Sequence, residues 1–232
     1  MTSIPSVKFG EDPRYTIPVA AVLAGTTPIT LRRWLVGTPP AHDREPQPSV
    51  IPDDWKTIEG HVYASFYNVV EAGFLAAYRN LGAPMQRIRR AVENVRGRSE
   101  NPRPLLGENF KKLGKDLLYE FESIGGVNIV ENVSSDGQIV LRDIVETHFD
   151  SIEYDRHGPI LMWLTAHRTI GITPSVGFGY PIIVRTGLRT DAVFAAFSAG
   201  EEIPDIADDY SITTEEVSEA IRWETEALRR AA

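Results

Sequence analysis

The sequence predicts an α+β protein with a helix-turn-helix near its N-terminus, a small antiparallel β-rich middle and a helix-turn-helix-like unit of three helices at its C-terminus. Three observations predict this fold class. Apolar residues repeat at three- and four-residue spacing over 17–24 and 67–95, the period of one helix face. Short β-rich runs separated by turn residues fill about 112–184. Helical spacing then returns. We therefore divide the chain into residues 1–104, 105–184 and 185–232.

The helix-turn-helix is predicted over residues 15–34, YTIPVAAVLAGTTPITLRRW. Gly25 stands where a left-handed residue ends a helix. Thr27 is suited to cap the next helix, with Pro28 at its first position. Leu31 and Leu35 are expected to pack on the first helix. The remaining residues are expected to face outward or to flank the contact between the two helices: Thr30, Arg32, Arg33 and Trp34. Adjacent arginines on such a helix fit phosphate neutralisation or guanine readout, and solvated arginines on an ordinary helical hairpin are the alternative.

A segment rich in Pro and turn residues follows, from about 35 to 66, where a wing or a surface loop is expected. A second helical hairpin is predicted over 67–81 and 85–96. Its apolar faces include Val70, Phe74, Ile88 and Val92. Its arginines lie on the other faces: Arg87 and Arg90 on one side, Arg89 and Arg96 on the other.

Strands are predicted over 116–121, 127–133, 138–141, 151–154 and 160–164, with the hairpin over 127–141 the firmest of them. At the C-terminus, helices are predicted over 190–199 and 204–210 and from the capping box of Thr213 and Glu216 onward. The first of them is expected to turn Val193, Phe194 and Phe197 inward.

The net charge of −8 is distributed unevenly along the chain. Between residues 61 and 103 seven arginines stand against three glutamates. Between residues 191 and 226 eleven carboxylates stand against Arg222 alone. A basic N-terminal half and an acidic C-terminal unit indicate a division of labour, with nucleic acid binding confined to the first.

Several classes of function lack their motifs in this sequence. Cysteine is absent, and the five histidines are scattered without metal-ligand spacing. There is no nucleophile elbow, no P-loop, and Gly177–Gly179 fails as a dinucleotide fingerprint. We therefore expect a protein that is not an enzyme and that binds no cofactor or metal. No apolar run is long enough to cross a membrane, and the N-terminus has no apolar signal core, so a cytoplasmic location is expected.

Two family resemblances follow from these segments. The segment 15–34, the Pro-rich loop and VVEAGFLAAYRNLGAPMQRIRRAV together resemble the DNA-binding domain of MerR-type regulators. The C-terminal run looks like the short domain of antitoxins that pair with PIN-domain nucleases. It carries Gly179-Tyr180-Pro181, Gly187-Leu188-Arg189-Thr190, Ala199-Gly200-Glu201-Glu202-Ile203 and Asp209-Tyr210. The combination is similar to the long VapB-like antitoxins and covers most of the chain.

These resemblances imply an antitoxin that neutralises a PIN-domain ribonuclease and represses its own promoter as a homodimer. The residues expected at double-stranded DNA are Thr27, Thr30, Arg32, Arg33, Trp34, Arg87, Arg89 and Arg90. Those expected at the toxin are Asp205, Asp208, Asp209, Glu215, Glu219, Trp223, and Arg229 and Arg230 at a frayed C-terminus. The alternative is a stand-alone MerR-like regulator that senses a small molecule through its β-rich middle.

Overall fold

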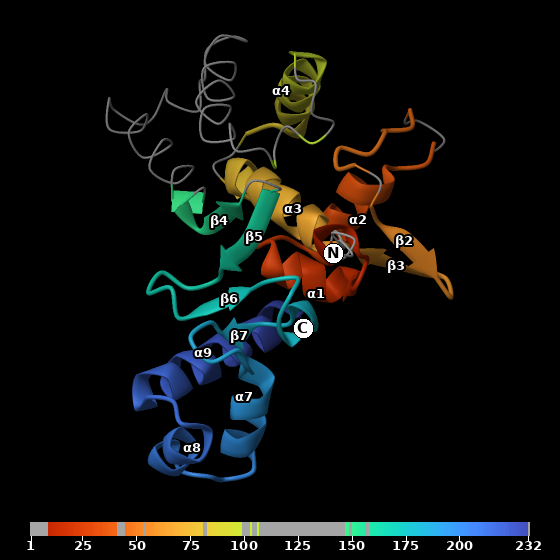
Figure 1. Cartoon of the computed structure of the whole chain (residues 1–232). Coiled ribbons are helices and arrows are strands. Elements are labelled where there is room, and N and C mark those ends of the chain that lie inside the picture. The colour runs from red at the N-terminus through yellow and green to blue at the C-terminus, as the bar shows by residue number, and fades with distance from the viewer. Residues whose placement is uncertain are drawn as a thin grey trace, which may run out of the picture.

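The fold is taken from a computed structural model, which describes residues 9–40, 45–52, 54–80, 83–98, 103, 106, 147, 148, 150–155 and 158–231. In Figure 1 the N-terminal helices lie toward the top of the molecule and the C-terminal helices toward the bottom, with the strands of a sheet between them. The coarse prediction of mixed α and antiparallel β structure is confirmed.

The chain begins with a short 3-10 helix, η1 (Phe9–Glu11), and a two-residue strand, β1 (Tyr15–Thr16). The two helices predicted over 15–34 are α1 (Ile17–Leu23) and α2 (Pro28–Val36), and they pack against each other. Gly25 lies between them with a φ of 67°, a conformation that glycine adopts without steric cost.

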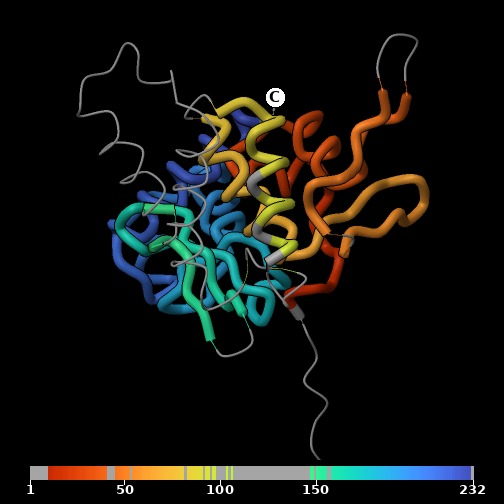
Figure 2. The backbone as a smooth tube through the Cα atoms, turned by 90° about the horizontal axis from the view of Figure 1, so that it is seen from above, coloured from red at the N-terminus to blue at the C-terminus, as the bar shows by residue number. Residues whose placement is uncertain are grey.

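A β-hairpin follows α2, made of β2 (Lys56–Ile58) and β3 (His61–Ala64). Its turn residues Glu59 and Gly60 both have positive φ, as a two-residue hairpin turn of the primed type requires. Strand β1 pairs with β3, so the sheet has the order β1-β3-β2. The hairpin lies inside the segment where a wing was expected, and it projects from the helices on the right of Figure 2.

Helix α3 (Phe66–Asn80) is the central helix of the N-terminal core and is followed by α4 (Met85–Arg98). Helix α3 contacts α1, α2, α4 and strand β5. Its burial extends beyond the predicted apolar face, because Asn68 and Glu71 are also buried. A helix that is enclosed on most sides must provide partners for such polar side chains.

The five strands of the second sheet lie between the two groups of helices. They are β4 (Ile152–Asp155), β5 (Gly158–Trp163), β6 (Ile170–Ile172), β7 (Ile182–Ile183) and β8 (Leu188–Arg189), antiparallel and in that order. The strands predicted over 151–154 and 160–164 are confirmed as β4 and β5. Those predicted over 116–121, 127–133 and 138–141 lie outside the described residues. The sheet continues across the predicted border at residues 184 and 185, since β7 pairs with β8.

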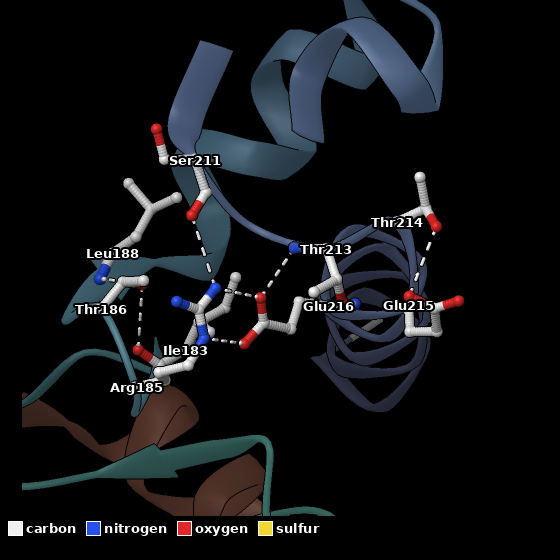
Figure 3. A network of polar contacts seen from close by, with 9 residues as sticks. All are labelled: Ile183, Arg185, Thr186, Leu188, Ser211, Thr213, Thr214, Glu215 and Glu216. Carbon is white, nitrogen blue, oxygen red and sulfur yellow. Dashed lines mark hydrogen bonds and ion pairs between the residues drawn. The ribbon is translucent and has the colours of Figure 1, made fainter. Parts of the chain in front are cut away.

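The C-terminal helices are α7 (Thr190–Ser198), α8 (Ile203–Tyr210) and α9 (Thr214–Ala231). The capping box is present: the Glu216 N–H donates to Thr213 Oγ1 at 3.2 Å, and the Thr213 N–H donates to Glu216 Oε2 at 2.8 Å. Arg185 holds the same Glu216 carboxylate through two N–H groups (Figure 3). One prediction for α7 was wrong: Phe197 is 41% exposed, because Val193 and Ala196 fill the inward positions.

Two hydrophobic cores meet at the sheet. The N-terminal core includes Met162 and Ile172, whereas the C-terminal core includes Ile170 and Ile183. Leu164 and Trp223 pack against both cores. Ile170 and Ile172 are two residues apart on β6 and therefore point to the same face of the sheet, so the two cores meet along the length of this strand and not across its two faces. Over the described part of the chain, no helix combines the length and the apolar character that a membrane span needs.

Candidate nucleic-acid interface

Helix α2 begins with the cap that the sequence predicts. The Thr30 N–H donates to Thr27 Oγ1 at 3.3 Å, and the Thr27 hydroxyl also donates to Thr30 Oγ1 at 2.9 Å. Pro28 occupies the first turn, where its missing N–H leaves no hydrogen bond unmade. Thr27 and Thr30 are therefore engaged with each other at the exposed start of the helix.

The two adjacent arginines of α2 face outward as predicted. Arg32 and Arg33 are both exposed, and within the described part of the chain neither has a carboxylate partner. Trp34 was expected beside them, and that prediction was wrong, because its side chain is only 3% exposed and belongs to the N-terminal core. Trp34 anchors α2 from within, so its ring is not available to DNA.

A cleft of about 590 Å³ opens between α2 and α4. Three arginines line it, Arg33 from α2, Arg79 from α3 and Arg89 from α4, and no carboxylate lies among the lining residues that the structure describes. The other lining residues are Thr30, Trp34, Thr38, Gln47, Pro84, Met85 and Gln86. Guanidinium groups gathered in a cleft favour an anion such as a phosphate, and of the three only Arg89 interacts with a carboxylate among the described residues, that of Glu93.

Two arginines of α4, Arg89 and Arg96, make hydrogen bonds with other described residues of the fold, and two others, Arg87 and Arg90, do not. Arg89 Nη1 donates to the Pro48 carbonyl at 2.6 Å, and Arg96 Nη2 donates to the Val50 carbonyl at 2.6 Å. Burial lowers the pKa of both arginines. These bonds hold the segment after α2 against α4. Arg87 is half-buried and Arg90 exposed, and neither has a partner among the residues that the structure describes.

Arg79, which was not predicted from the sequence, reaches the cleft from the end of α3. Its Nη1 donates to the Ala83 carbonyl at 3.1 Å, so the side chain is held in place between α3 and α4. The signal was weak because Arg79 ends a buried helix, where a basic residue also favours the helix dipole.

A buried group of charges lies on another side of α3. Arg103 donates to Glu71 at 3.1 Å, forms an ion pair with Asp54, and lies over the Tyr67 ring at 5.6 Å. Glu71 is completely buried, and burial raises its pKa to about 7 despite the neighbouring Arg103. These charges lie outside the cleft and serve the N-terminal core.

No group of three or more His, Asp or Glu side chains in the described residues is placed to hold a metal ion. His148 packs against Gly73 of α3, where an added Cβ would lie 2.8 Å from its Cε1. Its Nε2 is buried without a hydrogen-bond partner, and burial lowers the pKa of this side chain to about 4. His148 is therefore neutral at physiological pH.

The residues expected at a toxin are spread over α8 and α9. The exposed carboxylates are Asp205, Asp208, Asp209 and Glu215, whereas Glu219 is half-buried. Trp223, expected to be an interface anchor, instead packs mainly between the two cores. Arg229 and Arg230, which were expected at a frayed C-terminus, lie within α9, and both pair with Glu226, at 2.8 and 3.1 Å.

Comparison with known proteins gives three similarities. Residues 170–223, from β6 into α9, match the family described as "Protein of unknown function (DUF433)". A curated Mycobacterium tuberculosis (strain ATCC 25618 / H37Rv) protein named "Putative antitoxin VapB45" is 25% identical over 225 residues, which cover 90% of this chain and 92% of that protein. The crystal structure of Rv2018 from Mycobacterium tuberculosis matches with a TM-score of 0.66 and 22% identity, over 90% of this chain and 97% of the other. The structural match shows a shared fold over nearly the whole length.

Proposed function

We propose that this chain is an antitoxin that represses its own promoter and neutralises a PIN-domain ribonuclease, and that it is not an enzyme. The similarity to a named antitoxin over nine-tenths of both chains supports the class. The observation that carries the DNA-binding half of the proposal is the cleft between α2 and α4, whose described lining holds three arginines and no carboxylate. Phosphate contacts of this kind supply most of the affinity of a protein for DNA.

The arrangement supports a winged helix-turn-helix of the MerR type. Helix α2 exposes Arg32 and Arg33, and the β2–β3 hairpin that follows it packs against α1 through β3. In such a reader the second helix enters the major groove, and flanking elements contact phosphates. We assign base or phosphate contact to Arg32 and Arg33, and phosphate contact to Arg87, Arg89 and Arg90.

The test of DNA binding uses the double variant Arg32→Ala, Arg33→Ala and a fragment of the chain's own promoter. Removing two phosphate contacts should reduce the slope of log affinity against log salt by about two units. If either arginine reads a base, the variant should also lose roughly 1–3 kcal/mol of discrimination at that position. Fluorescence anisotropy over a salt series measures both effects.

The matched control is Arg229→Ala, Arg230→Ala, which removes the same formal charge from α9. This control should keep the wild-type affinity and slope. Equal losses in both variants would indicate a general charge effect, and unchanged binding in the α2 variant would refute the assignment of α2.

A homodimer is part of the proposal because one helix-turn-helix contacts few base pairs. Two copies related by a two-fold axis can place two α2 helices about one DNA turn apart on a palindromic site. Light scattering at micromolar protein concentration in moderate salt should give twice the chain mass. A monomer under these conditions would count against dimeric readout.

The toxin part is tested by co-expression with the product of the adjacent gene. The full chain should rescue growth and co-purify with that product, and failure of both would refute the antitoxin role. The variant Arg229→Ala, Arg230→Ala addresses how inhibition occurs. If it rescues as well as the full chain, these arginines do not reach the nuclease site, and the acidic residues of α8 and α9 become the stronger candidates.

A further inference from the structure

A tight turn between β6 and β7 presents one aromatic side chain to solvent. Three consecutive residues in it have positive φ: Gly177 at 62°, Phe178 at 55° and Gly179 at 84°. Phe178 is 81% exposed, the largest exposure among the large hydrophobic side chains in the described chain. A bulky residue with positive φ is a steric outlier, and an exposed phenylalanine gains little from burial to offset that cost.

The turn is held firmly against the N-terminal unit. The Tyr15 hydroxyl donates to the Gly179 carbonyl at 2.9 Å in a buried bond, and Arg14 Nη1 donates to the Pro174 carbonyl at 2.9 Å. A Cβ on Gly179 would lie 2.4 Å from the Tyr15 hydroxyl oxygen, so the close approach requires glycine. Phe178 is thus displayed by a fixed backbone.

An apolar groove of about 250 Å³ lies next to the turn, between α1 and α9. Tyr180, two residues after Phe178, lines this groove and is 45% exposed. Val19 and Leu228, which are 37% and 58% exposed, line it from the two helices. The remaining lining residues are Pro18, Val22, Leu23, Pro181, Asp191, Trp223, Glu224 and Ala227.

The charge around the groove favours a basic binding partner over a second copy of this chain. Asp191 and Glu224 are the charged residues among its described lining. Beside the groove, the Arg189 guanidinium pairs with Asp191 and lies 4.1 Å from the centre of the Tyr180 ring. Glu224 is therefore the lining carboxylate without an ion pair among the described residues. The C-terminal unit behind it, residues 185–232, carries eleven carboxylates against five arginines and is therefore acidic overall. A second copy docked by the same unit would bring like charges together, which costs affinity. A basic partner with an apolar anchor site gains both hydrophobic contact and charge complementarity.

We propose that Phe178 and the groove beside it, lined by Val19, Tyr180 and Leu228, form the docking surface for the toxin, through a basic surface of the toxin that carries an apolar pocket. This inference rests on the proposed antitoxin function and names the surface that performs it. The preformed turn lowers the entropic cost of association because the aromatic side chain is already displayed before the partner arrives. Exposed aromatic anchors of this kind dominate binding energy at interfaces.

The test is Phe178→Gly in the full chain, because glycine removes the ring and also adopts positive φ without strain. The melting temperature of the variant should equal or exceed that of the wild type. Its affinity for the co-purified adjacent-gene product should fall by roughly thirtyfold or more, the loss expected of an interface anchor. Isothermal titration calorimetry against that purified product measures the affinity.

The matched control is Phe197→Ser, which removes an exposed phenylalanine from α7 and should leave affinity unchanged. A wild-type affinity for the Phe178→Gly variant would overturn the docking surface while leaving the antitoxin function intact. A lowered melting temperature would overturn it too, because it would show that the ring serves the fold. Loss of self-association in the variant would assign the surface to a second copy instead. If the wild-type chain itself does not bind the product, the proposed function and this inference fail together.

Discussion

The arginines of α2 and those around α7 and α9 differ in whether they pair with carboxylates. On α2, Arg32 and Arg33 are exposed without a carboxylate partner among the described residues. Around α7 and α9, Arg185 pairs with Glu216 at 2.7 Å, Arg189 pairs with Asp191, and Arg229 pairs with Glu226. A guanidinium that already holds a carboxylate has fewer donors to offer an external anion. In this chain, the pairing of arginines with carboxylates is therefore a better guide to nucleic acid binding than the number of basic residues.

The two regions nevertheless meet at one side chain, and replacing that side chain has the largest expected effect on stability. Trp223 of α9 packs against both hydrophobic cores. Replacing it with Ala should lower the free energy of unfolding by about 3 kcal/mol, the lower end for truncation of a buried tryptophan, because the ring is only half-buried. Urea unfolding followed by circular dichroism measures the change.

The neighbouring Arg222→Ala is the control, since Arg222 is exposed, and it should change stability by no more than about 0.5 kcal/mol. If Trp223→Ala splits the unfolding curve into two transitions, the regions are separate folding units joined by this contact. An unchanged midpoint would mean that the two cores do not depend on it.

Local features of this fold could be predicted from the sequence, and long-range ones could not. The caps at Thr27 and Thr213 were predictable because each hydroxyl meets an N–H three residues away. The burial of Trp34 depends on a core assembled from distant segments, so helix spacing alone misassigned it. The bond from Tyr15 to Gly179 spans 164 residues, and no local pattern encodes it.

The candidate sites follow the same division. Arg32 and Arg33 were identified because they stand side by side on a predicted helix. The cleft that adds Arg79 requires α2, α3 and α4 to be packed together. Phe178 was missed because its significance comes from a positive φ and high exposure, neither of which a sequence pattern around Gly177–Gly179 reveals.

The N-terminal core also differs from the C-terminal unit in burying ionisable groups, which predicts two opposed pH effects. The pKa of Glu71 is raised to about 7, so its contribution to stability is lost as pH rises from about 4.5 to 7. The pKa of His148 is lowered to about 4, so its contribution is lost as pH falls from about 6.5 to 4. At about 1.4 kcal/mol for each tenfold change in proton affinity, each effect is about 3 kcal/mol.

Two variants separate these opposed effects. In Glu71→Gln, the free energy of unfolding should rise more steeply from pH 4.5 to 6.5 than it does in the wild type. In His148→Gln, it should instead fall over the same range. Thermal unfolding over a pH series measures both. Parallel curves for all three proteins would show that neither group changes its proton affinity on folding.

The smallest predicted effect compares the helix caps of the two regions. Thr213→Ala should destabilise the protein by about 1 kcal/mol, as expected for loss of an N-cap. Thr27→Ala should cost less, because Thr27 accepts one long bond of 3.3 Å, whereas Thr213 shares a reciprocal box with Glu216 that Arg185 reinforces. Thr214→Ala is the control, since it lies next to the cap without serving it. Urea midpoints rank the three variants. A larger loss at Thr27 than at Thr213 would mean that α2 depends on its cap more than α9 does, and that the paired charges of the C-terminal unit contribute little to its stability.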